Sequence, residues 1–122
     1  MIQGIGLDVV SLDRIARAYT NKAGFADRIL TGKEKDLFKS FSDKRKIEFL
    51  AGRFAAKEAY AKALGCGIGK DVSFQDIEIL STEKGKPELV NLKDNKKPLV
   101  IHLSITHTNE YAAAQVVIEK RM

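Results

Sequence analysis

Glu58 is the most unusual charged residue in the chain, because it is the only acid between Phe49 and Leu64, where alanine and large apolar residues dominate. The other charged residues of this stretch are Arg53, Lys57 and Lys62. In a helix, with about 100° per residue, Glu58 and Lys62 share one face, and the other two cations share an adjoining face. One carboxylate among three cations suits a metal ion that binds phosphate groups. The alternative is an ion pair between Glu58 and Lys62, with the other two cations in solvent.

Asp8 is the second acid in an unfavourable place. It lies in the alternating segment from Ile2 to Val10, which is typical of a strand, and aspartate is disfavoured in strand interiors. One face of this strand is expected to be a core face, made of Ile5, Leu7 and Val9. The opposite face carries Asp8 beside Gly4 and Gly6, so a ligand or another backbone can approach it closely. We interpret Asp8 as a metal ligand; the alternative is an aspartate that caps a turn at the strand end.

Three further features are suited to phosphate binding. His107 follows the alternating segment from Leu99 to Thr106, where it is either a phosphate ligand or a neutral histidine of a turn. The glycine-rich segment from Gly65 to Gly69 can present backbone N–H groups to a phosphate, although it is neither a Walker loop nor a Rossmann fingerprint. Lysine and arginine at the start of the long helix oppose its dipole, which either a bound anion or solvent relieves. These basic residues are Lys44, Arg45 and Lys46.

Positive charge also gathers around Phe25, in the segment that follows the first predicted strand. The basic residues there are Arg14, Arg17, Lys22 and Arg28. A basic surface with an aromatic residue is typical of a docking site for an acidic protein helix or for nucleic acid. The alternative is a solvated helix face.

One long helix is predicted to position these residues; it begins after Ser42 or Asp43 and ends at Gly65. Shorter helices are predicted after Ser11, from Phe25 to Leu30, and after Thr31, where Glu34 completes a capping box. The last third of the chain alternates as strands. Its predicted elements are a strand around Phe74 to Ile79, a strand or short helix from Glu88 to Leu92, a polar loop from Lys93 to Pro98, and strands from Leu99 to Thr106 and from Tyr111 to Glu119.

The bulk composition indicates one globular domain over residues 1–122, with 44% hydrophobic residues to form a core. A net charge of +5 favours an acidic partner, such as nucleic acid, a phosphorylated small molecule or an acidic protein. Cys66 is the only cysteine, which indicates a reducing compartment. The first ten residues do not resemble a signal peptide, and no apolar run is long enough to span a membrane. We therefore expect a cytoplasmic protein.

Several motifs together resemble the holo-acyl-carrier-protein synthases, the small phosphopantetheinyl transferases of bacterial fatty-acid synthesis. The motifs are GIGLDVVSLDRI, FLAGRFAAKEAYAKALGCGIG, FQDIEIL followed by GKP, and HLSITHTNEYAAAQVVIE. They cover nearly the whole chain, in order. The resemblance implies an α+β fold of the phosphopantetheinyl-transferase type, with a long central helix packed on a small antiparallel sheet. It also implies Mg²⁺-dependent transfer of 4′-phosphopantetheine from coenzyme A to a serine of apo-acyl carrier protein, by a homotrimer with sites at subunit interfaces.

The same resemblance assigns expected roles to the candidate residues. Asp8 and Glu58 match the metal-binding acids, and Lys62 matches the residue that neutralises the pyrophosphate of coenzyme A. The 3′-phosphate and adenosine end is expected to contact Lys44, Arg45, Arg53 and His107, with the loop that starts at Gly65 lining the nucleotide site. Glu58 is the candidate base for the serine proton, either directly or through a water molecule. The expected docking residues for the acidic carrier protein are Arg14, Arg17, Phe25 and Arg28.

Two other classes of protein remain possible from the residues alone. A basic nucleic-acid-binding module is compatible with the charge, but aromatic residues are few and no known motif is present, so we expect no nucleic-acid partner. A non-catalytic interaction protein is the second alternative, in which Asp8 and Glu58 are only paired with lysines.

Overall fold

The computed structural model describes residues 1–93 and 99–121. The predicted polar loop from Lys93 to Pro98 lies, apart from Lys93, outside the described residues. The helices are α1 (Leu12–Asn21), α2 (Phe25–Ile29), α3 (Gly32–Lys39) and α4 (Asp43–Leu64), with a short 3₁₀ helix η1 (Phe74–Asp76). The strands are β1 (Ile2–Ser11), β2 (Ile77–Ser81), β3 (Pro87–Asn91), β4 (Leu99–His107) and β5 (Tyr111–Lys120).

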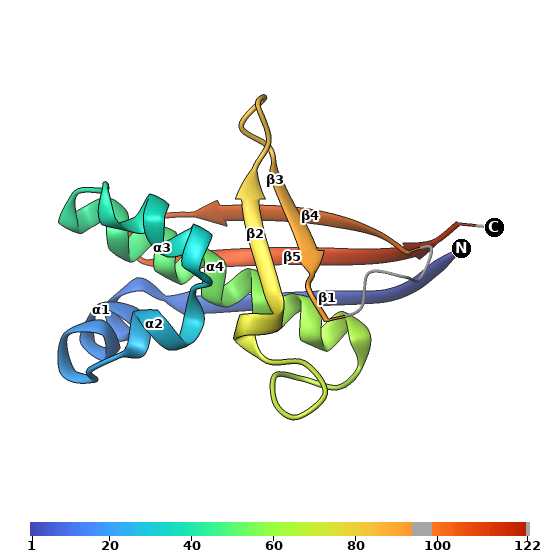
Figure 1. The fold of residues 1–122 in the computed structure, drawn as a ribbon, viewed down its shortest axis with the longest axis horizontal. Helices are drawn as coiled ribbons and strands as arrows, with labels where there is room; N and C mark the ends of the chain where they lie inside the picture. The colour runs from blue at the N-terminus through green and yellow to red at the C-terminus, as the bar shows by residue number, and fades with distance from the viewer. Residues whose placement is uncertain (94–98, 122) are drawn as a thin grey trace.

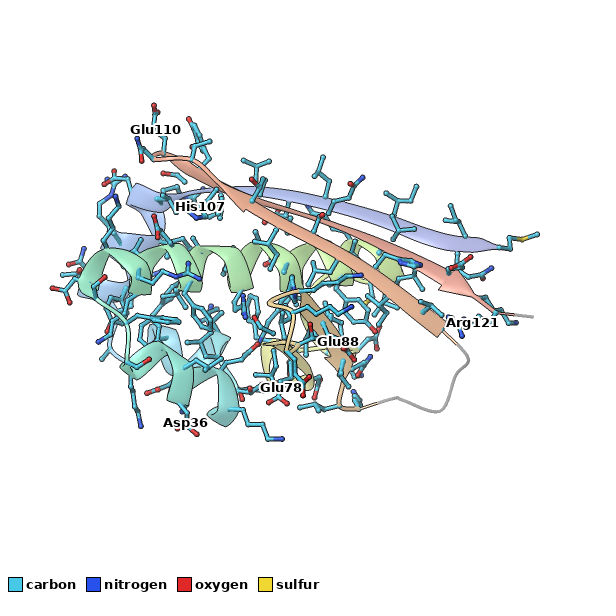
Figure 2. All side chains as sticks on the ribbon, turned by 90° about the horizontal axis from the view of Figure 1, so that it is seen from above. Asp36, Glu78, Glu88, His107, Glu110 and Arg121 are labelled. Carbon is cyan, nitrogen blue, oxygen red and sulfur yellow. The ribbon has the colours of Figure 1, made fainter. Side chains whose placement is uncertain are left out.

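The long helix α4 lies between two layers (Figures 1 and 2). One layer is an antiparallel sheet with the strand order β1-β5-β4. The other layer contains α2, α3, η1 and the two-stranded sheet β2-β3, which crosses α4 on the side away from the first sheet. The predicted α+β architecture is confirmed, and the segment from Glu88 is a strand in this structure.

The ends of the helices follow from local chemistry. The Ser42 hydroxyl accepts a hydrogen bond from the backbone N–H of Arg45, which satisfies one of the unpaired donors at the start of α4. Gly65 ends α4 in the left-handed region at φ 85°, where glycine is favoured. Thr31 and Glu34 form the predicted capping box of α3. These predictions from sequence are confirmed.

The packing of β1 against α4 reverses one prediction. The glycine face of β1 lies on α4, and Ile5, Leu7 and Val9 point outward with 61%, 58% and 59% of their surface exposed. The expectation that these three residues form the core face is therefore wrong for the single chain. The reason is steric, because a Cβ atom on Gly4 would lie 2.0 Å from the Ala63 carbonyl oxygen. The expected close approach of another backbone to the glycine face is confirmed, and that backbone belongs to α4.

The core occupies both sides of α4. On the sheet side, Val116 and Ile118 of β5 are buried against the helix. On the other side, Leu30, Ile77 and Ile79 are completely buried. Among the described residues, no helix combines the length and the apolar character needed to cross a membrane.

Candidate active site

Asp8 and Lys62 meet between β1 and α4. The Lys62 ammonium donates hydrogen bonds to Asp8 Oδ1 at 3.0 Å and to the Leu7 carbonyl oxygen at 3.1 Å. The Lys62 side chain is 51% exposed and the Asp8 side chain 17%, so the pair lies at the molecular surface with its carboxylate partly covered. Glu58 lies one helical turn before Lys62 and is half-buried. The structure therefore brings Asp8, Glu58 and Lys62 together from two elements far apart in sequence.

Glu58 has a raised pKa in this environment. Burial is the largest cause, the negative charge of Asp8 is the second, and the positive charge of Lys62 acts in the opposite direction. Two neighbouring carboxylates, one of them partly desolvated, repel each other unless a cation binds between them. This donor set fits a hard cation such as Mg²⁺, which prefers few carboxylates and takes its other ligands from water and phosphate oxygen.

Small residues let β1 and α4 lie close together, and so bring Asp8 near Glu58. A Cβ atom on Gly6 would lie 1.7 Å from the Ala59 carbonyl oxygen, so only glycine allows the backbones of β1 and α4 to approach so closely. Asp8 follows Gly6 on the same face of β1, and Glu58 precedes Ala59 on α4. The contact between Gly6 and Ala59 therefore sets the distance between the two acids.

A second group of predicted residues surrounds a pocket of about 260 Å³ at the other end of α4. Arg45, Arg53 and His107 line this pocket together with Glu48. Glu48 lies 3.9 Å from Arg45 Nη1 and 3.7 Å from His107 Nδ1, so it holds the two side chains toward each other. The turn between β2 and β3 completes the wall, through Ser81, Gly85 and Pro87.

Arg53 has the features of a buried anion ligand. Its guanidinium carbon lies 4.3 Å from the centroid of the Phe49 ring. Its Nε atom is buried and has no hydrogen-bond partner among residues 1–93 and 99–121. Burial lowers the pKa of Arg53 to about 10, while Glu34 raises it and Arg45 lowers it further. A phosphate group is the kind of ligand that offers both an acceptor and a negative charge to such a side chain.

The two groups of residues are separate within one chain. Asp8 is on β1 and His107 is on β4, with β5 between them, which places the two strands about 10 Å apart. Glu58 follows Arg45 on α4 with a rise of about 20 Å along the helix axis. Asp8 and Glu58 thus lie apart from His107 and Arg45 within one chain.

The remaining predicted residues lie at the surface. Lys44 is exposed at the start of α4, and Gly65 has open space where a Cβ atom would be. Arg14 and Arg28 are exposed on α1 and α2, and Arg17 forms a 3.0 Å ion pair with Asp13. Phe25 is half-buried and stacks on Phe54, with ring centroids 6.5 Å apart.

The alternative drawn from the sequence, in which Arg53 and Lys57 remain in solvent, is wrong. Lys57 is completely buried and pairs with Glu34 at 2.7 Å, and Arg53 is also buried. Sequence reasoning identified Glu34 only as a capping residue and did not single out Glu48. The spacing of Arg45 and Glu48, three residues apart on a helix, is the signal that points to Glu48. No local signal links Glu34 to Lys57, because they are distant in sequence.

Comparison with known proteins identifies close relatives. The sequence pattern of the 4′-phosphopantetheinyl transferase superfamily matches residues 4–116. The holo-[acyl-carrier-protein] synthase of Bacillus subtilis (strain 168) is 57% identical to this chain over 120 residues, which is 98% of each protein. A crystal structure of a holo-(acyl-carrier-protein) synthase from Bacillus anthracis str. Ames, in complex with CoA (3′,5′-ADP), matches with a TM-score of 0.91 at 48% identity and covers 99% of both chains. The Helicobacter pylori enzyme in complex with coenzyme A matches with a TM-score of 0.80 at 36% identity and covers 94% of this chain and 99% of that one.

Proposed function

The chain belongs to the holo-[acyl-carrier-protein] synthases, the 4′-phosphopantetheinyl transferases that move phosphopantetheine from coenzyme A to acyl carrier protein in fatty-acid biosynthesis, and we propose that Asp8, Glu58 and Lys62 perform this transfer. The observation that carries the proposal is their convergence at the contact of β1 and α4, with the raised pKa of Glu58. An acid with a raised pKa beside a cation is typical of functional sites.

Asp8 and Glu58 are the residues that would hold Mg²⁺. When bound, the ion neutralises charge on the pyrophosphate of coenzyme A and orients it for in-line displacement. The fit rests on the repulsion between the two carboxylates and on the partial burial of Glu58, both of which a cation relieves.

The chain's own residues have distinct roles in the reaction. The serine oxygen of the carrier protein forms a bond to the β-phosphorus of coenzyme A, the bond from that phosphorus to the bridging oxygen breaks, and adenosine 3′,5′-bisphosphate leaves. Glu58 takes the serine proton, directly or through a water molecule, since it is the half-buried carboxylate beside Lys62 at this site. Lys62 is half-exposed beside Asp8 and stabilises the charge that grows on the phosphate oxygens.

The adenosine end of coenzyme A is assigned to the second pocket, with Arg45, Arg53 and His107 as ligands and Lys44 in support. The carrying observation is the buried Nε of Arg53, which finds no acceptor among the described residues. The CoA complexes of the relatives support this assignment only at the level of the family.

We further propose a homotrimer in which the pocket of one chain meets the acids of the next. Within one chain Asp8 and His107 lie on strands about 10 Å apart, and Glu58 and Arg45 lie about 20 Å apart along α4, so one coenzyme A molecule is served best by two chains. The outward face of β1 supports this assembly, because its exposed residues form an apolar strip that a second chain can cover. These residues are Ile5, Leu7 and Val9.

The carrier protein is proposed to dock on α1 and α2 through Arg14, Arg17, Phe25 and Arg28. Phe25 stacks on Phe54, which lies one helical turn before Glu58 on α4. Docking at Phe25 therefore brings the partner close to the acids. Cys66 is exposed and unpaired, which suits a reducing cytoplasm as the place of action.

Intact-mass spectrometry tests the proposed function directly. Apo-acyl carrier protein incubated with this protein, coenzyme A and Mg²⁺ is expected to gain the mass of one phosphopantetheine group. A variant carrier protein with alanine in place of the acceptor serine is the matched control. No mass gain, together with salt-dependent binding to generic DNA or RNA, would instead support a nucleic-acid-binding module.

A further inference from the structure

The central helix α4 is apolar on nearly all sides, so hydrophobic burial does not by itself determine its rotation about its own axis. Buried side chains of α4 face both layers, and they include Leu50, Ala55, Ala59 and Tyr60. A helix with one apolar stripe is oriented by that stripe, whereas a helix that is apolar all round needs directional contacts. The site depends on this rotation, because Glu58 must face Asp8.

Lys57, the residue before Glu58, makes the directional contacts on the side of α4 opposite the sheet. Its ammonium group is completely buried and donates three hydrogen bonds. The acceptors are the Ile29 carbonyl oxygen at 2.7 Å, Glu34 Oε1 at 2.7 Å and the Phe74 carbonyl oxygen at 3.0 Å. Because an ammonium has three donors, all of them are used.

The acceptors are themselves held in place. Glu34 Oε1 also accepts the Thr31 backbone N–H at 2.8 Å, and Glu34 Oε2 accepts the Ile79 backbone N–H at 2.8 Å. The Gln75 side chain ties η1 to the chain around α2 by donating to the Asp27 and Leu30 carbonyl oxygens, each at 2.8 Å. Lys57 is therefore hydrogen-bonded to α2, α3 and η1, and further hydrogen bonds link these segments to their neighbours.

A buried ion pair of this kind is a weak source of stability, because desolvation offsets most of the attraction. Its better-attested use is to specify one arrangement among several of similar energy. For α4 the alternative arrangements are small rotations about its own axis. A rotation of about 20° would move a carboxylate about 6 Å from the helix axis by about 2 Å, which changes the distance between Glu58 and Asp8.

We infer that Lys57 is a positioning residue for the metal site: its hydrogen bonds to Ile29, Glu34 and Phe74 fix the rotation of α4 so that Glu58 faces Asp8. The close contact of Gly6 with Ala59 sets the distance between α4 and β1, and Lys57 sets the angle. The inference rests on the proposed role of Glu58 as a metal ligand. The inference gives the neighbouring residues Lys57 and Glu58 different roles. Glu58 touches the reacting groups, whereas Lys57 acts only through Glu58.

The test measures Mn²⁺ affinity by electron paramagnetic resonance, in the presence of coenzyme A, for Lys57→Met. Loss of a residue that orients a metal ligand typically weakens metal binding by about 10- to 100-fold, and we expect a loss in that range. Leu50→Ala is the matched control, because Leu50 is buried two turns earlier on the same face of α4 and makes no ion pair. This control is expected to lower stability while changing Mn²⁺ affinity by less than about twofold.

A double-mutant cycle shows whether Lys57 acts through Glu58. In a Glu58→Gln background, Lys57→Met is expected to cause no further loss of Mn²⁺ affinity, because the positioned carboxylate is already absent. If Lys57→Met does not fold, Glu34→Gln replaces it, since this change keeps the side-chain shape and removes the charge that holds Lys57.

Three results would overturn the inference. They are an undiminished Mn²⁺ affinity in the folded variant, an equal loss in Leu50→Ala, and an equal loss with and without the Glu58 carboxylate. The failure of the proposed function is distinguishable, because then Glu58→Gln alone would leave Mn²⁺ affinity unchanged.

Discussion

Replacement of Gly6 by alanine is a sharp test of how the site is built. The new Cβ atom would lie 1.7 Å from the Ala59 carbonyl oxygen, 2.7 Å from the Ala59 carbonyl carbon and 2.9 Å from the Ala63 nitrogen. All three atoms belong to the backbone of α4, so no side chain can rotate out of the way. The helix as a whole must move away from β1.

The size of the effect follows from these distances. A carbon–oxygen contact needs about 3.2 Å, so α4 must shift by about 1.5 Å near Ala59, which is more than a single added methyl usually demands of a core. We expect a loss of at least about 3 kcal/mol in the free energy of unfolding, at the upper end of overpacking costs. Because Glu58 precedes Ala59, the shift also separates Glu58 from Asp8, and misplacement by about 1 Å can lower a rate by about 100-fold.

Urea unfolding and the rate of carrier-protein modification measure the two effects. Gly32→Ala is the matched control, because a Cβ atom at Gly32 meets no atom within 4 Å among the described residues and Gly32 is the first residue of α3. Alanine there is expected to leave the rate unchanged and to raise stability by up to about 1 kcal/mol. A Gly6→Ala protein with native stability and a native rate would show that α4 and β1 do not depend on this close contact.

Three other changes probe the charges of the proposed site. Burial and the charge of Asp8 raise the pKa of Glu58. The folded protein therefore keeps the proton of Glu58 at a higher pH than the unfolded chain does. As a result, the free energy of unfolding falls as the pH rises from about 4.3 through the raised pKa. Glu58→Gln is expected to remove that fall in urea unfolding of the metal-free protein and to abolish transfer; an unchanged pH dependence would contradict the assigned cause. Lys62→Ala is expected to lower kcat more than it weakens coenzyme A binding, because the charge that Lys62 meets grows in the transition state; a pure binding defect, measured by calorimetry beside steady-state kinetics, would argue against this role. Arg14→Glu is expected to raise the KM for carrier protein and to reduce the salt dependence of the reaction, with coenzyme A affinity unchanged; steady-state kinetics at low and high salt that show an unaffected KM would place docking elsewhere.

Much of the local structure is determined by the sequence alone. The bounds of α4 follow from the Ser42 cap and from Gly65, and α3 begins where the spacing of Thr31 and Glu34 predicts. The sequence predicts that Glu58 and Lys62 share one helix face, because residues four apart in a helix are neighbours. These features depend on residues within one turn of each other, so no tertiary contact is needed to predict them.

The tertiary structure decided what depends on distant partners. Alternation in β1 predicts two unlike faces, but it does not say which face a helix will cover. The structure covers the glycine face, because only there can the backbone of α4 approach, and it leaves Ile5 and Leu7 exposed.

Lys57 is the second feature that only the tertiary structure decides. Its partner Glu34 lies 23 residues away in the sequence, and the capping box of α3 already explains Glu34 locally, so the sequence does not predict this pair. The separation of His107 from Asp8 is a third case, since it follows from the strand order β1-β5-β4. Helix caps and helix faces are local and can be predicted from the sequence, whereas the partners of buried charges and the placement of distant side chains depend on how the layers pack.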